Sequence, residues 1–97
     1  MNIYKVEQQL NNGYDTYDSF VCIAATEQEA RETYPSQFIT HHKDGDWYGT
    51  YTEGGEYKQI GSDWVEFGEI DQIKITLIGV ANAEQTKGVV IASFNAG

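Results

Sequence analysis

Residues 20–30 read Phe-Val-Cys-Ile-Ala-Ala-Thr-Glu-Gln-Glu-Ala, and this stretch decides the fold. Its first six residues are apolar, so both faces of an extended strand would be apolar here, as is typical of a central strand. Thr26 and Glu29 then match a capping box, in which the threonine accepts from the third helical N–H and the glutamate reaches back to the cap. We therefore expect a central strand from about Ser19 and a short helix that runs to Tyr34, where Pro35 ends it.

Short strands are predicted on both sides of this unit. Residues 3–8 have the pattern of a first strand, and Asn11-Asn12-Gly13 supplies residues that tolerate positive φ where a hairpin turns. Aromatic and threonine-rich residues interrupted by glycines predict two or three short antiparallel strands within 46–67. Apolar residues alternate from 73 to 80, and a last strand is expected over 89–94 after a polar connection.

The predicted fold is α+β: one small domain of residues 1–97, with an antiparallel sheet of four to six strands and one short helix packed on one face. A chain of this length must share one core among nearly all its elements. The side chains expected in that core are Ile3 or Tyr4, Phe20, Cys22, Ile23, Ala30, Tyr34, Ile73, Ile75, Leu77, Val90 and Ala92.

The chain is strongly acidic, with 15 aspartates and glutamates against six lysines and arginines and a net charge of -9. Phosphate binding depends on clustered lysine and arginine, so direct binding of nucleic acid is not expected. A protein with a basic surface is the better electrostatic match. The acid is concentrated in residues 44–71, where eight carboxylates stand among six aromatic residues and a single cation.

Two groups of residues are candidates for binding. The first belongs to the acidic stretch and comprises Trp47, Tyr51, Glu53, Glu56, Trp64 and Glu66. The second follows the turn glycine and comprises Tyr14, Asp15, Tyr17 and Asp18. A structural interpretation competes with both, because strands can expose acid for solubility while they bury aromatics, and aspartates can cap local N–H groups. The exposure of the two tryptophans distinguishes a binding role from a structural one. An exposed tryptophan beside carboxylates is typical of an interface anchor, whereas a buried tryptophan is typical of the core.

The sequence contains no recognisable catalytic or metal-binding motif. His41 and His42 are neighbours that would point in different directions in a strand, so we expect exposed loop residues and no metal site. Cys22 lies inside an apolar strand, so it is expected in the core rather than as a nucleophile, and alone it forms no internal disulfide. The prediction is a protein that is not an enzyme and has no cofactor and no catalytic residue.

The apolar runs of the chain are short. They fall well below the roughly 18 residues that span a bilayer. The first strand begins almost at Met1, without the basic and apolar regions of a secretory signal. We therefore expect a cytoplasmic protein that does not associate with membranes.

Three segments carry a resemblance to a known group of proteins. Residues 11–19 (NNGYDTYDS), 24–31 (AATEQEAR) and 88–97 (GVVIASFNAG) resemble a group of short, uncharacterised phage and prophage proteins. The resemblance covers both ends of the chain, whereas residues 36–71 depart from the pattern. It implies a phage-encoded accessory protein in the host cytoplasm, and it brings no established chemistry that could be assigned to residues.

Three functions are compatible with these observations. The first is an acidic protein that blocks a host protein through a negatively charged aromatic surface, by analogy with anti-CRISPR and other anti-defence proteins. The second is a protein that binds or sequesters a small nucleotide-like ligand, with Tyr14, Tyr17 or a tryptophan stacked on the base. The third is a structural or homo-oligomeric accessory protein, for which an open sheet edge would serve.

Overall fold

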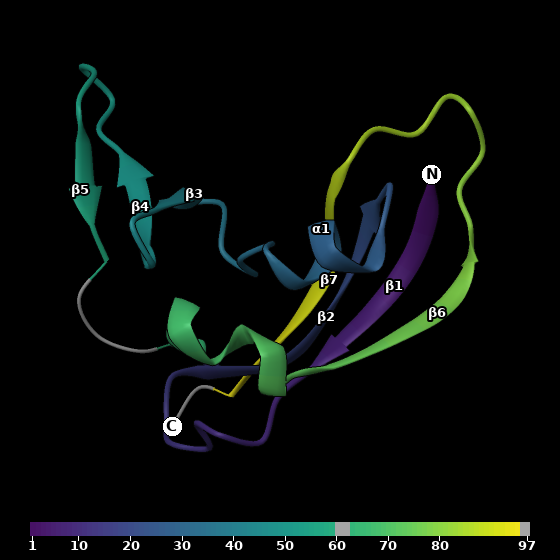
Figure 1. The fold of residues 1–97 in the computed structure, drawn as a ribbon, viewed down its shortest axis with the longest axis horizontal. Coiled ribbons are helices and arrows are strands. Elements are labelled where there is room, and N and C mark those ends of the chain that lie inside the picture. Colours follow the sequence, from purple (N-terminus) through teal and green to yellow (C-terminus); the bar gives the residue numbers. More distant parts are fainter. Residues whose placement is uncertain (60–62, 96–97) are drawn as a thin grey trace.

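The computed structural model describes residues 1–59 and 63–95, and its larger unit is a four-stranded antiparallel sheet (Figure 1). The order of its strands is β6 (Lys74–Val80), β1 (Asn2–Glu7), β2 (Thr16–Ala24) and β7 (Gly88–Asn95). β2 pairs with β1 on one side and with β7 on the other, so the prediction of a central strand is confirmed. Ala96 and Gly97, which end the segment of resemblance, lie outside the described residues.

A second sheet is formed by β3 (Ile39–Lys43), β4 (Asp46–Thr50) and β5 (Glu56–Lys58), and it stands apart from the first sheet in Figure 1. The α+β class is confirmed, but the strands divide between two sheets instead of forming one. The prediction that His41 and His42 lie in a loop is wrong. Asp44 and Gly45 both have positive φ, 54° and 82°, and they turn β3 into β4 as a tight hairpin.

The helix α1 (Glu27–Arg31) is capped as predicted, but it is shorter than expected. Thr26 Oγ1 accepts from the N–H of Glu29 at 3.1 Å, and the Glu29 carboxylate accepts from the N–H of Ala25 at 3.1 Å, one residue before the cap. α1 ends because Thr33 closes a tighter turn on Ala30 at 3.2 Å. Within the described residues, no helix is long and apolar enough to cross a membrane.

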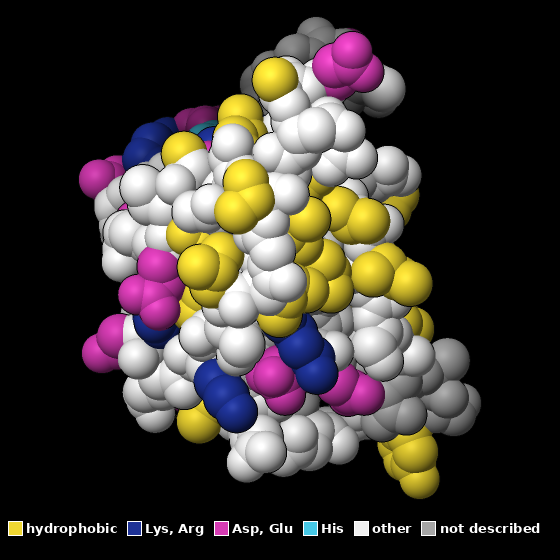
Figure 2. Space-filling model, turned by 90° about the vertical axis from the view of Figure 1, so that its right-hand side faces the viewer, with side chains coloured by type: hydrophobic (Ala, Val, Ile, Leu, Met, Phe, Trp, Pro, Cys, Tyr) yellow, Lys and Arg dark blue, Asp and Glu magenta, His cyan; other side chains and the backbone are white. Residues whose placement is uncertain are grey.

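The outer face of the four-stranded sheet, on the side away from the second sheet, carries hydrophobic side chains at its centre (Figure 2). Two core predictions are wrong, one because of a bulge and one because the residue lies in an edge strand. Val90 is the extra residue of a bulge in β7 and is 60% exposed. Leu77 lies beside a bulge in the edge strand β6 and is 59% exposed. Ile23 is buried as predicted but does not belong to the main core cluster.

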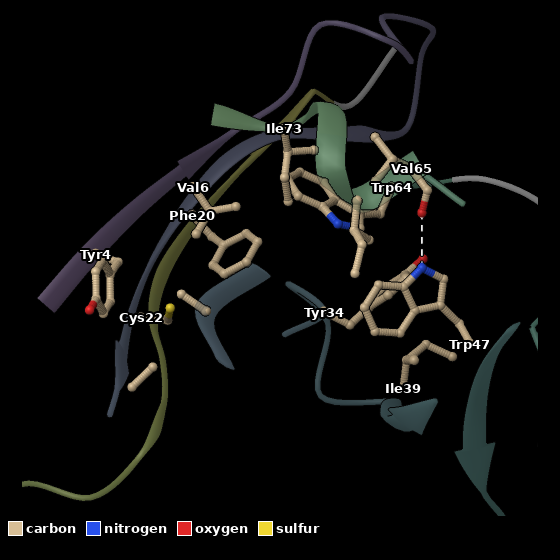
Figure 3. Close-up of a cluster of buried hydrophobic side chains, with 13 residues drawn as sticks. Tyr4, Val6, Phe20, Cys22, Tyr34, Ile39, Trp47, Trp64, Val65 and Ile73 are labelled. Carbon is tan, nitrogen blue, oxygen red and sulfur yellow. Dashed lines mark hydrogen bonds between the residues drawn. The ribbon is translucent and has the colours of Figure 1, made fainter. Parts of the chain in front are cut away.

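The main core lies between the two sheets and joins them (Figure 3). Phe20 of β2 meets Trp64 edge to face, with ring centroids 5.2 Å apart, and Tyr34 meets Trp47 of β4 in the same way at 5.1 Å. The segment between β5 and β6, which includes the 3₁₀ helix η1 (Phe67–Gln72), closes one side of this core. The second sheet is therefore held to the first by packing around the tryptophans.

Candidate functional site

The short helix leaves a groove beside β7, the edge strand of the larger sheet. The contacts of α1 fall mainly on β2, β1 and β6. Val89 and Ala92, which pair with the core residues Cys22 and Phe20, therefore face an open groove of about 760 Å³. Residues 36–42, which lead into and form most of β3, make the opposite wall. The groove thus lies directly next to a strand edge.

The groove is lined by four aromatic side chains, Tyr17, Tyr34, Phe38 and Trp47. The Tyr34 hydroxyl donates to the Asp63 carboxylate, and burial together with Asp63 raises the pKa of Tyr34 far above its ordinary range. The N–H of Tyr17 donates to the Asp63 backbone oxygen at 2.8 Å. Asp63 therefore holds the side chain of Tyr34 and the backbone of Tyr17, and the phenol of Tyr34 stays protonated.

Carboxylates predominate over lysine at the rim of the groove. Lys87 Nζ lies 3.6 Å from Glu29, and His42 Nε2 lies 3.7 Å from Glu32. The His42 ring also stacks on Phe67 at a centroid distance of 4.3 Å. Two carboxylates, those of Glu29 and Glu32, therefore stand beside a single lysine at the rim. This rim favours a neutral or cationic ligand over an anionic nucleotide.

The acid of the second sheet is partly neutralised by its own cations. Glu56 binds Lys43 and accepts from His41 Nε2 at 2.7 Å, and these partners lower the pKa of the Glu56 carboxyl. Asp46 lies 3.3 Å from Lys58. This sheet is therefore a network of exposed ion pairs, which contribute little stability each.

The tryptophans of the acidic stretch are buried. Trp47 is 5% exposed and Trp64 is 1% exposed, so both meet the condition for a structural role, and their assignment as exposed binding anchors is not supported. The reason is that the strand and loop around them face the first sheet, where both rings pack into the shared core. Tyr51 is 53% exposed and tilts against Tyr57 with ring centroids 4.9 Å apart.

The remaining predicted binding residues lie at separate places. Glu53 is exposed in the turn after β4, and Glu66 is exposed just before η1. Tyr14 is 81% exposed, and Asp15 next to it has a positive φ of 58°.

Asp18 is exposed at the bulge in β2. Of the ten predicted residues, the structure brings Tyr17 and Trp47 together in the groove.

The other groove residues carried no signal for binding in the sequence. The groove is assembled from α1, β3 and β7, which are distant along the chain, so no local motif marks its side chains. Among these side chains are Glu29, Glu32, His42, Lys87, Val89 and Ala92.

The two histidines point to different partners, as expected for neighbours in a strand. His41 contacts Glu56, whereas His42 contacts Glu32. Across residues 1–59 and 63–95, no group of three His, Cys, Asp or Glu side chains is placed to hold a metal ion.

Comparison with protein-family models, with curated proteins and with solved structures found no match.

Proposed function

We propose that this chain is an acidic protein-binding domain that holds an extended, basic segment of another protein in the groove beside β7. The observation that carries the proposal is the position of the groove at the edge of the larger sheet. A segment added to an edge strand gains main-chain hydrogen bonds, and its alternate side chains enter the adjacent pocket. Tyr17, which is half-buried, and Phe38, which is exposed, would supply aromatic contact area there.

The distribution of charge supports a basic partner. Lys5, Lys43, Lys58 and Lys87 each lie in an ion pair, and Arg31 donates to the backbone oxygens of Ile70 and Ile73 at 2.6 and 3.0 Å. These cations are held within the molecule, while the net charge remains -9. The excess carboxylate would steer a basic partner toward the protein, and binding should weaken as salt rises.

The resemblance to short phage and prophage proteins supports a particular partner. We infer a host protein in the host cytoplasm, which the bound domain would block in the manner of an anti-CRISPR or other anti-defence protein. Occupation of a basic segment would deny that protein its own acidic ligand or partner.

Retention of a host protein tests this proposal. The wild-type chain, immobilised, should retain a host-lysate protein at about 50 mM salt and release it as salt rises above about 500 mM. Val89→Arg should lose this retention, because it places a bulky cation in the groove. Thr86→Arg adds the same charge at an exposed position that does not line the groove, and it should retain the protein. If the immobilised wild-type chain retains no host-lysate protein at low salt, the proposal is wrong.

The exposed acid outside the groove is tested separately. Reversal of charge at Glu53, Glu56 and Glu66 should abolish retention if the partner binds the acidic stretch itself. If the groove is the binding site, the triple variant should slow association but still retain the protein at low salt.

A second candidate function is the binding of a small ligand with a flat ring. The half-buried ring of Tyr17 lines the groove, which is a specific observation in its favour, although the carboxylates of the rim oppose an anionic nucleotide. Native mass spectrometry of the protein from host cells would show a retained small molecule in this case. The protein-binding proposal predicts the mass of the chain alone.

A further inference from the structure

The outer face of the four-stranded sheet has a composition unlike that of the whole chain. The strand register assigns the side chains on this face, because cross-strand partners share a face. They are Ile3, Lys5 and Glu7 of β1, Ser19, Val21 and Ile23 of β2, Lys74 and Thr76 of β6, and Ile91 and Ser93 of β7. Apolar and hydroxyl side chains make up most of this set.

The apolar part of this face is continuous and partly exposed. Ile23 is 6% exposed although it lies outside the main core cluster, so its neighbours on the outer face cover it. Ile3 pairs with Ile23 and also approaches Gly79, where an added Cβ would lie 3.6 Å from Ile3 Cδ1. Ile91, beside Val21, is 65% exposed. Figure 2 shows hydrophobic side chains gathered over the middle of this face.

The charges of the outer face gather at one end of the sheet. Glu7 pairs in register with Lys74 and lies 3.6 Å from Lys5 Nζ. Among the in-register residues of this face there are therefore two lysines and one glutamate. This balance differs from that of the whole chain, which has a net charge of -9. A second copy of the chain can approach here without meeting a surface of carboxylates, and the pattern is self-complementary, because the glutamate of one copy can meet a lysine of the other.

We propose that two copies of this chain associate through their outer faces, with the two sheets packed on each other about a two-fold axis. Two sheets packed in this way lie about 10 Å apart and bury the side chains of their facing surfaces. Strand spacings of about 4.8 Å and rises of about 3.3 Å per residue give a face of roughly 20 by 20 Å. Such a contact is at the low end of specific interfaces, so the dimer is weak and depends on concentration.

Salt should strengthen this dimer contact, whereas it should weaken the binding of a basic partner. Two chains with a net charge of -9 repel each other at long range, and salt screens this repulsion. The buried contact is mainly apolar, so salt weakens it little. Dimerisation should therefore strengthen from about 20 mM to about 300 mM salt, whereas retention of a basic host protein should weaken over the same range.

Sedimentation equilibrium at increasing protein concentration tests this proposal. The wild-type chain should pass from monomer to dimer, and Ile91→Lys should shift the dimerisation constant at least about tenfold toward monomer. Val80→Lys is the matched control. Val80 is 76% exposed and pairs with Asn2, which lies on the opposite face of β1 from Ile3, so this variant should dimerise like wild type.

Two results would overturn the dimer. The first is a wild-type chain that stays monomeric up to about 1 mM. The second is an Ile91→Lys variant that dimerises as wild type does. Neither result bears on the groove, because Ile91 does not line it, and retention of a host protein by Ile91→Lys is measured separately.

Discussion

Trp47 and Val65 are joined by a buried hydrogen bond, in which Trp47 Nε1 donates to the Val65 backbone oxygen at 3.0 Å (Figure 3). The bond ties the second sheet to the segment that leads into β6. It also fixes one wall of the groove, because Trp47 lines it. The geometry of the groove therefore depends on how firmly the second sheet is held.

Trp47→Phe should lower the free energy of unfolding more than Trp64→Phe. Both changes remove the same volume from buried sites, but Trp47→Phe also leaves the Val65 oxygen without its donor, at a cost of about 1–3 kcal/mol. Among the described residues, Trp64 Nε1 has no hydrogen-bond partner to lose. Urea unfolding followed by far-ultraviolet circular dichroism measures both variants. Equal losses would contradict the structural role of the Trp47 bond.

Gly49→Ala should destabilise the protein, and Gly68→Ala should not. A Cβ at residue 49 would collide with the ring of Tyr57 and the backbone oxygen of Phe38, whereas one at residue 68 meets nothing within 4 Å. Overpacking of this kind costs about 1–3 kcal/mol. Thermal unfolding of the two variants provides the comparison, and a Gly49→Ala variant as stable as wild type would show that β4 and β5 do not pack as described.

Tyr34→Phe should cost about 1–3 kcal/mol, because it removes a hydrogen bond to the carboxylate of Asp63. Tyr14→Phe is the control, since the Tyr14 side chain is 81% exposed, and its stability should match wild type. Both variants keep the aromatic ring, so chemical denaturation isolates the hydroxyl group. Two variants of equal stability would argue against the Tyr34–Asp63 bond.

Stability should fall at alkaline pH, in part because of Cys22. Burial, followed by the nearby charge of Glu29, raises the pKa of the Cys22 thiol from 9.0 to about 11. Below the unfolded pKa the thiol is protonated in both states. As pH rises from about 9 to about 11, the unfolded state loses its proton first, so up to about 3 kcal/mol of stability is lost.

Cys22→Ala tests this contribution. The variant should be less stable at neutral pH because of the cavity, but its stability should decline less steeply over the same alkaline range. Tyr34, whose pKa is also raised, supplies the alkaline loss that remains. Parallel pH profiles for wild type and Cys22→Ala would contradict the role of the thiol.

The sequence was most informative where local chemistry determined local structure. The apolar run from Phe20 predicted the central strand, and Thr26 with Glu29 predicted the cap of α1. Both signals act within a few residues, so tertiary contacts had little to change.

Features that depend on distant contacts could not be predicted from the sequence. Val90 has the apolar character of a core residue, but a bulge in β7 turns it to solvent. The aromatic residues of the acidic stretch were predicted as candidates for a surface, yet Trp47 and Trp64 are buried because a second sheet packs on the first. The groove arises from the short length of α1 and its position over neighbouring strands, which no motif records.

Hydrogen exchange of the chain bound to its retained host protein tests the central claim most directly. Backbone amides of β7, at the edge of the larger sheet, should exchange more slowly in the complex than in the free chain. Protection confined to the acidic residues 44–58, with β7 unchanged, would contradict the groove as the binding site.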